Sequence, residues 1–309
     1  KKPVKPDQWG AGPRRVGVIV VAGGIVEGKS TNVPILGIRT AGDETLVKAL
    51  DSARKNHQIA AVVLRVESGG GSSLASDRIW RAVYRLARKK PVVASFGGVA
   101  ASGGYYIAAP ATEIVAAPST LTGSIGVYYG KADLSGLLDK LDVNVTVLKK
   151  GGQKVDMESM HRPYTDEEVV FLKEQLNHFY NLFLERVGAG RDMSRDQVHE
   201  IAQGRIWSGK RARDLGLVDS VGTLVHALAR ARALGKVPAW VPVTDLTPGP
   251  GLIAKLLSSV SAKAKDGSVS DLAAIITRSS GLMELFPTAM FLLREDETPL
   301  ALCPATVSL

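Results

Sequence analysis

Three short runs of apolar, mostly β-branched residues constrain the fold of this chain most. They are Val16–Ala22 (VGVIVVA), Ala60–Val66 (AAVVLRV) and Pro91–Ser95 (PVVAS). Nearly continuous apolar strands of this kind are typical of parallel sheets that are buried on both faces. Between them, Asp43–Asn56 and Ser76–Arg88 carry apolar residues at helical spacing and are predicted as amphipathic helices. The order of elements predicts an α/β fold built on a parallel sheet.

The second half of the chain is predicted to be mainly helical. After a strand at Glu113–Ala116 and a turn at Pro118–Gly126, the pattern gives a helix at Asp133–Leu141 and a strand at Val143–Leu148 (VNVTVL). A long helix then begins at a Thr-x-x-Glu capping box, in which Thr165 precedes Glu168 by three residues. This long helix is predicted over Thr165–Val187. Three more helices are predicted after it, at Ser194–Gln203, Ser208–Leu215 and Thr223–Leu234.

Composition divides the chain into three parts. Residues 1–15, with three prolines among basic side chains, are predicted as a linker, and residues 16–237 as one domain. From residue 238 the composition changes, and 238–309 is predicted as an extension for packing or assembly, with a possible helix at Leu252–Ala264. Gly23–Gly42 is loop-rich and is predicted as a flap on the substrate side. Because the chain begins at Lys1 without a methionine, we expect a fragment or processed product whose missing start could carry a signal or an anchor.

Charge and cysteine content exclude several classes of site. The net charge of +9 would suit an anionic surface, but the basic residues are scattered and only 6% of residues are aromatic, so no nucleic-acid site is predicted. The single cysteine, Cys303, excludes an internal disulfide and any multi-thiolate metal site, and neither a metal nor a cofactor is expected. The longest uncharged run, Pro91–Thr112, contains four glycines and two prolines, which favours a strand, a loop and a buried helix over a membrane span.

Ser102 is the strongest candidate for chemistry. It lies in the stretch VVASFGGVAASGGYY, where a predicted strand gives way to a helix. A serine at this place is commonly a helix N-cap, whose hydroxyl accepts a backbone N–H. The start of a helix also presents unpaired N–H groups to a developing oxyanion, so a nucleophilic role is the alternative.

A second glycine cluster, Glu67–Ser72, follows the preceding strand of the predicted sheet. Alone it is weak evidence, because such a turn can cradle phosphate, cap a helix or simply reverse the chain. Neighbouring parallel strands would, however, bring this cluster and Ser102 to the same edge of the sheet.

A nucleophilic serine needs a base to accept its proton. The five histidines lie on predicted helices or loops away from the glycine clusters, which leaves lysine as the alternative. Lys154, in the segment KKGGQKVD, is the candidate, although spacing alone does not separate it from Lys149 and Lys150. A lysine acts as a base only when it is neutral, which requires burial or a nearby positive charge.

Several motifs in order resemble the bacterial serine peptidases of family S49, the signal peptide peptidases. They are LRVESGGGSSLASD, KPVVASFGGVAASGGYYIA, IVAAPSTLTGSIGVYYG, VTVLKKGGQKVDMES and GRIWSGKRARDLGLVD, and the resemblance runs from about Val16 to Gly235. It implies a ClpP/crotonase-like fold of repeated β-β-α units with a helical second half. It also implies a Ser/Lys dyad of Ser102 and Lys154, with the backbone N–H groups of Gly71 and Gly103 forming the oxyanion hole.

The resemblance implies further properties of the protein. The substrates would be small apolar peptides such as cleaved signal peptides, and the expected cleft lining is Val99, Ala100, Ala101 and Tyr105. Family members complete the active site between neighbouring domains, so we expect a ring-like homo-oligomer or a partner half-domain. The implied location is the bacterial cell envelope, at the outer face of the cytoplasmic membrane, with membrane association through a missing N-terminal segment.

One position departs from the family pattern. The turn usually reads Ser-Pro-Gly-Gly, whereas this chain has Gly69 in place of the proline. Loss of the proline should loosen the loop that presents Gly71. Two alternatives therefore stay open: an inactive scaffold or assembly subunit of the same fold, and a crotonase-like acyl-CoA enzyme that would use the glycine N–H groups to stabilise an enolate.

Overall fold

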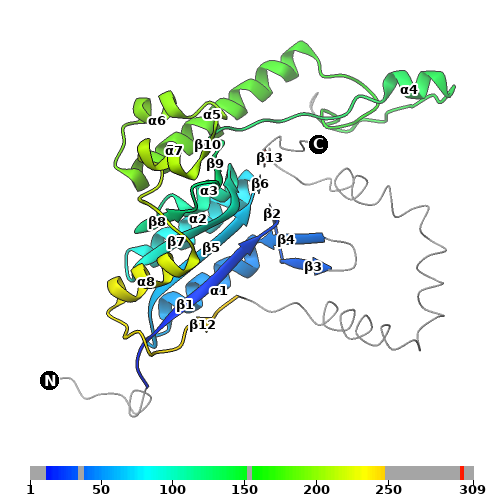
Figure 1. The fold of residues 1–309 in the computed structure, drawn as a ribbon. Helices are drawn as coiled ribbons and strands as arrows, with labels where there is room; N and C mark the ends of the chain where they lie inside the picture. The colour runs from blue at the N-terminus through cyan, green and yellow to red at the C-terminus, as the bar shows by residue number, and fades with distance from the viewer. Residues whose placement is uncertain (1–11, 34–37, 152–154, 248–299, 303–309) are drawn as a thin grey trace, which may run out of the picture.

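The computed structural model describes residues 12–33, 38–151, 155–247 and 300–302 (Figure 1). The strands are β1 (Arg15–Ala22), β2 (Gly24–Val26), β3 (Thr31–Val33), β4 (Ile38–Gly42), β5 (Ile59–Ser68), β6 (Gly70–Ser72), β7 (Val92–Ala101), β8 (Glu113–Ala116), β9 (Leu121–Gly123), β10 (Ile206–Ser208), β11 (Ser220–Val221), β12 (Thr244–Asp245) and β13 (Leu300–Leu302). The helices are α1 (Asp43–Lys55), α2 (Ser73–Ala87), α3 (Gly103–Ala108), α4 (Ser135–Lys140), α5 (Asp166–Arg191), α6 (Arg195–Ile201), α7 (Gly209–Asp214) and α8 (Leu224–Gly235).

An eight-stranded sheet forms the body of the fold. Its order is β10-β9-β7-β5-β1-β12, with β8 paired to β7 and β11 paired to β8. All of these pairs are parallel except β9 with β10. The predicted α/β class with a parallel sheet is therefore confirmed.

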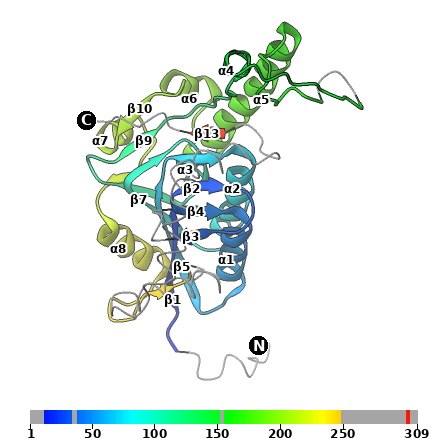
Figure 2. The ribbon, with the colours of Figure 1, turned by 90° about the vertical axis from the view of Figure 1, so that its right-hand side faces the viewer.

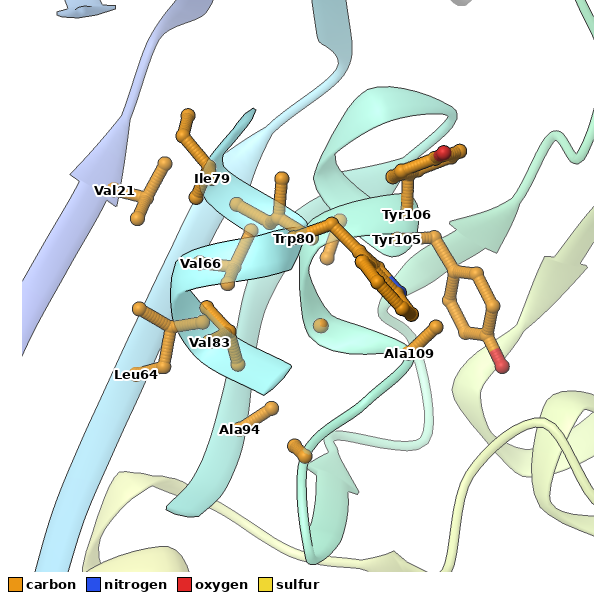
Figure 3. Close-up of a cluster of buried hydrophobic side chains, with 14 of the residues drawn as sticks. Val21, Leu64, Val66, Ile79, Trp80, Val83, Ala94, Tyr105, Tyr106 and Ala109 are labelled. Atoms are coloured by element: carbon orange, nitrogen blue, oxygen red, sulfur yellow. The ribbon is translucent and has the colours of Figure 1, made fainter. Parts of the chain in front are cut away.

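Helices cover both faces of this sheet, as the apolar strand pattern predicts (Figure 2). Along β5, Val62, Leu64 and Val66 belong to the core that includes α1 and α2, whereas Ala61 and Val63 belong to the core that includes α8. Figure 3 shows Leu64 and Val66 of β5 on the same side as Ile79 and Val83 of α2. All of these strand residues are fully buried.

A second, smaller sheet lies at the carboxyl end of the main strands. Its order is β13-β6-β2-β4-β3. The chain passes from β5 into β6 before entering α2, which is the expected β-β-α order, whereas four strands, β1 to β4, precede α1. The segment Gly23–Gly42, predicted to be loop-rich, thus contains three short strands. Strands of three to five residues leave too little pattern to be recognised from sequence.

The main sheet continues beyond residue 237. β12 pairs with β1 at Gly17 and Val18, and the backbone N–H of Val20 donates to the Thr247 hydroxyl at 3.0 Å. Residues 244–247 therefore extend the main sheet beyond the predicted domain boundary. The expected linker 1–15 is described only from residue 12, and the helix expected at Leu252–Ala264 lies outside the described residues.

The four helices predicted after residue 165 are confirmed as α5, α6, α7 and α8. α5 begins at the predicted capping box, since the Thr165 hydroxyl accepts the Glu168 N–H and the Glu168 carboxylate accepts the Thr165 N–H. In the described part of the chain, no helix is both long and apolar enough to span a bilayer.

Residues 127–151 and 155–165, with α4 at their far end, form an arm that projects from the body of the fold (Figure 1). The prediction of a strand at Val143–Leu148 is wrong. This segment pairs with no strand in the described chain. Its apolar side chains are exposed, Leu148 by 94%. A strand needs a partner, and the described residues offer none to this part of the arm.

An ionic cluster holds the base of the arm to α5. The Arg162 guanidinium contacts Glu168 at 2.7 Å and Asp156 at 3.0 Å, and Lys149 contacts Asp156 at 2.8 Å. Hydrogen bonds from Arg162 and the Thr165 N–H lower the pKa of Glu168 to about 2. Arg162 and then Lys149 hold the pKa of Asp156 well below its usual range.

Candidate active site

Ser102 is the residue between β7 and α3, and its backbone is held in an uncommon conformation. Its φ is 50° and its ψ is −121°, in a region that side chains rarely adopt. Its N–H donates to Gly123 O at 2.9 Å and its carbonyl accepts from Tyr106 N at 2.8 Å, which fixes the turn. A sharp, strained strand-to-helix turn of this kind is how several hydrolases present a nucleophilic serine.

The Ser102 hydroxyl does not act as a helix cap. It makes no capping hydrogen bond to α3, so the N-cap interpretation is wrong. The residue is 1% exposed, and no hydrogen-bond partner for its Oγ occurs among the described residues. A buried hydroxyl without a partner is costly and therefore uncommon.

The two glycine clusters meet beside Ser102, as expected from the parallel strands. A Cβ atom placed on Gly103 would lie 3.3 Å from Gly71 N and 3.2 Å from Gly70 Cα. A Cβ atom on Gly71, whose φ is 154°, would lie 2.0 Å from Ile25 O. At Gly71, backbone fills the space where a side chain would stand, and the positive φ also favours glycine. At Gly103, the nearest obstacle to a side chain is the Ser76 hydroxyl, at 2.6 Å. Backbone N–H groups from β6 and from the start of α3 are thus adjacent to the candidate nucleophile.

Two serines that sequence reasoning did not single out lie against these glycines. The Ser76 hydroxyl donates to Ser72 O at 2.8 Å and would lie 2.6 Å from a Cβ on Gly103. The Ser68 hydroxyl contacts Gly23 and Gly70. The sequence shows serines around the glycines, but only the packing of α2 against α3 shows which of them touch the site.

The expected base, Lys154, lies outside the described residues. Its neighbours Gly151 and Val155 are exposed on the arm. Lys149, one of the two alternatives, is paired with Asp156. No histidine or lysine in the described ranges reaches the Ser102 hydroxyl, so this part of the chain supplies the serine without its base.

Three of the four residues expected to line a substrate cleft are buried inside the fold. Ala100, Ala101 and Tyr105 are 0% exposed, and the prediction that they line an open cleft is wrong. The Tyr105 hydroxyl donates to Leu217 O at 2.8 Å, and burial raises the pKa of this group. β7 runs on through Ala101 as a central strand, which buries these side chains. Val99 is only half-buried.

A small recess next to Gly103 was not predicted. It is lined mainly by apolar and aromatic groups: Ser73, Ser76, Gly103, Tyr106, Val127, Phe179 and Phe183. The rings of Tyr106 and Phe183 lie 4.8 Å apart between centroids. Phe179 and Phe183 come from α5, far along the sequence, so no local pattern places them at the site.

Asp77 joins the helices around this recess. It is 8% exposed, and its carboxylate accepts hydrogen bonds from the Tyr106 hydroxyl at 2.9 Å, from Arg186 at 3.2 Å and from Arg81 at 2.6 Å. The Arg186 guanidinium also lies 4.0 Å from the centroid of the Trp80 ring. α2, α3 and α5 are thus fixed to one another behind the site.

Several known proteins with similar sequences are named as proteases or signal peptide peptidases. A model of peptidase family S49 matches residues 84–238, about half of the chain. The serine protease SPPA, chloroplastic, of Arabidopsis thaliana is 40% identical over 201 residues, which cover 65% of this chain and 30% of that protein. The putative protease slr0021 of Synechocystis is 37% identical over 196 residues, 63% of this chain and 70% of that protein. The putative signal peptide peptidase SppA of Enterococcus faecium is 36% identical over 186 residues, 60% of this chain and 54% of that protein.

A solved structure of a ClpP1 mutant from Listeria monocytogenes aligns with a TM-score of 0.44 and 14% sequence identity, over 68% of this chain and 94% of that one. The family model and the Synechocystis relative cover enough sequence to identify the family. The chain belongs to peptidase family S49.

Proposed function

We propose that this chain is a serine endopeptidase in which Ser102 is the nucleophile and Lys154 the general base. The observation that carries the proposal is the Ser102 hydroxyl, which is held at a positive φ and has no partner in the described structure. It stands next to Gly71 and Gly103, where a Cβ atom would lie within 3.0 Å of neighbouring atoms. This is the arrangement that acyl transfer requires: a nucleophile beside paired backbone N–H donors.

The chemistry follows from this arrangement. The Ser102 Oγ attacks the scissile carbonyl carbon while its proton passes to the neutral amine of Lys154. The N–H groups of Gly71 and Gly103 donate to the oxyanion of the tetrahedral intermediate. The lysine returns its proton to the leaving amine, and water then hydrolyses the acyl-enzyme by the same route in reverse.

We propose that the lysine reaches the serine from a neighbouring copy in a ring-like oligomer. The arm that carries residue 154 projects from the body of its own chain (Figure 1). Exposed apolar side chains on the arm, Leu148 above all, favour burial against another subunit. Such burial would also depress the pKa of Lys154 and so provide the neutral amine.

The substrates are proposed to be extended apolar peptides, such as signal peptides after their release. β13, with the sequence Leu-Ala-Leu, pairs antiparallel with β6, placing Ala301 opposite Gly71. The edge of β6 beside the oxyanion hole therefore accepts an extended apolar strand, which is how many proteins bind peptides. The corresponding location is the bacterial cell envelope, at the outer face of the cytoplasmic membrane.

The test is hydrolysis of a fluorogenic apolar-peptide library by the oligomer, with Ser102→Ala and Lys154→Ala at matched oligomeric state. Both variants should lose activity, while Lys149→Ala, on the same arm but paired with Asp156, should keep it. Mixing the two inactive variants and allowing subunits to exchange should restore part of the activity if serine and lysine come from different copies.

Other outcomes would refute parts of this proposal. An inert wild-type oligomer would favour the scaffold alternative, and coenzyme A retained through purification would favour the acyl-CoA alternative. An active Lys154→Ala variant would remove the assigned base. A failure of complementation, with both single variants inactive, would place serine and lysine in the same copy.

A further inference from the structure

Ser68, the last residue of β5, makes two hydrogen bonds through a buried hydroxyl. The residue is 3% exposed, its Oγ donates to Gly23 O at 2.6 Å, and it accepts the Gly70 N–H at 3.1 Å. The Gly23 N–H in turn donates to Glu67 O at 3.0 Å. One side chain thus ties the turn after β1 to the turn that leads to Gly71.

The backbone of Ser68 also contacts the elements that carry Ser102. Ser68 pairs with Ala100 of β7, two residues before the candidate nucleophile. A Cβ on Gly104 would lie 2.4 Å from Ser68 O, so the first turn of α3 packs directly on this residue. Ser68 therefore touches both components of the site, the oxyanion loop and the turn of Ser102.

The loop that Ser68 ties down is intrinsically flexible. It consists of three successive glycines, and Gly70 and Gly71 have φ values of 108° and 154°. Glycine loses more conformational freedom on folding than any other residue, so such a turn needs an external constraint to hold one orientation. Gly69 itself is not among the residues of positive φ, and its backbone therefore lies on the side of φ that proline occupies.

We infer that Ser68 is a positioning residue: its hydroxyl holds the Gly69–Gly70 peptide, and this fixes the orientation in which the next peptide directs the Gly71 N–H at the oxyanion. It supplies the rigidity that a proline at residue 69 would otherwise provide. The inference rests on the proposed function. It predicts that the hydroxyl and a proline at residue 69 are partly interchangeable, which a purely structural role of Ser68 does not predict.

The experiment compares Ser68→Ala, Gly69→Pro and the double variant in the assembled protein, with steady-state kinetics on one fluorogenic apolar peptide. Ser68→Ala should lower kcat about 10- to 100-fold and change KM less than about threefold, because a misdirected oxyanion donor acts on the transition state. Gly69→Pro alone should leave kcat equal or higher. Adding Gly69→Pro to Ser68→Ala should recover kcat at least about fivefold.

A matched control separates this effect from general destabilisation. Ser220 is on β11 in the main sheet, away from Ser102, and its buried hydroxyl has no partner among the described residues, unlike that of Ser68, so Ser220→Ala should leave kcat unchanged. The inference is overturned if Ser68→Ala keeps kcat within twofold, or if the proline restores melting temperature without restoring kcat.

A second measurement does not depend on catalysis. In a Ser102→Ala background, amide hydrogen exchange at Gly70 should accelerate at least about tenfold on Ser68→Ala and slow again on addition of Gly69→Pro. An inert wild-type enzyme that shows this pattern would refute the proposed function but retain the loop-holding role. Unchanged exchange at Gly70 in an active enzyme would refute the inference and leave the proposed function standing.

Discussion

Replacement of Gly103 by alanine should strain the contact between α2 and α3, and the strain can be assigned to one atom. The new Cβ would lie 2.6 Å from the Ser76 Oγ, well inside the 3.4 Å at which ordinary contact begins. The hydroxyl cannot move away freely, because it is 1% exposed and bonded to Ser72 O. Overpacking of this kind costs about 1–3 kcal/mol.

Ser76→Ala removes the clashing atom, so the two substitutions should be strongly coupled. Alone, it loses one hydrogen bond, at a cost of about 1 kcal/mol. In a protein that already carries Ser76→Ala, the new Cβ of residue 103 would lie 3.2 Å from Gly70 Cα and 3.3 Å from Gly71 N. Small backbone shifts can relieve these two contacts. The cost of Gly103→Ala should then fall below about 1 kcal/mol, giving a coupling of about 1–2 kcal/mol.

Urea denaturation of the four proteins of this cycle, in a Ser102→Ala background, measures the coupling directly. The slopes must agree among the four proteins for the comparison to hold. A coupling below about 0.5 kcal/mol would show that Ser76 does not limit the space at Gly103, and would refute the reasoning.

Three further perturbations test other parts of the structure. Asp77→Ala removes the carboxylate that pairs with Arg186 and should lower the free energy of unfolding, measured by urea denaturation, by about 3–5 kcal/mol. A decrease of less than about 1 kcal/mol would contradict this. Because the pKa of Glu168 is lowered to about 2, its contribution to stability is present above pH 4.5 and is lost as the pH falls toward 2. The resistance of the arm to proteolysis should therefore decrease as the pH falls over that range. Arg162→Ala should abolish this pH dependence. Proteolysis of the wild type at a rate that does not change with pH would contradict the prediction. Leu148→Asp should reduce the oligomer mass in light scattering, and an unchanged mass would remove the arm from the interface.

Sequence sufficed where local pattern and tertiary environment agree. The apolar run Ala60–Val66 becomes a central strand because both of its faces are covered, and Thr165 caps α5 through bonds within four residues. Ser102 at a strand-to-helix turn was also predictable, since the strand signal and the glycines are contiguous.

The predictions that failed depend on contacts between distant segments. Val143–Leu148 alternates like a strand, yet a strand requires a partner that the described chain does not provide. The aromatic side chain of Tyr105 would suit a substrate cleft, but its hydroxyl donates a hydrogen bond to Leu217 O on a loop far away in the sequence. Phe179 reaches the recess only because a 26-residue helix packs across α2 and α3.

Under the proposed function, the backbone conformation of Ser102 sets stability and activity against each other at one residue. Glycine adopts φ 50° and ψ −121° without the steric penalty of a side chain, and it carries no hydroxyl to bury unpaired. Ser102→Gly is therefore expected to melt at a higher temperature than the wild type while losing all peptidase activity. A library of variants selected for thermal stability alone would be enriched in glycine at residue 102, and only a screen that also demands turnover would retain the serine.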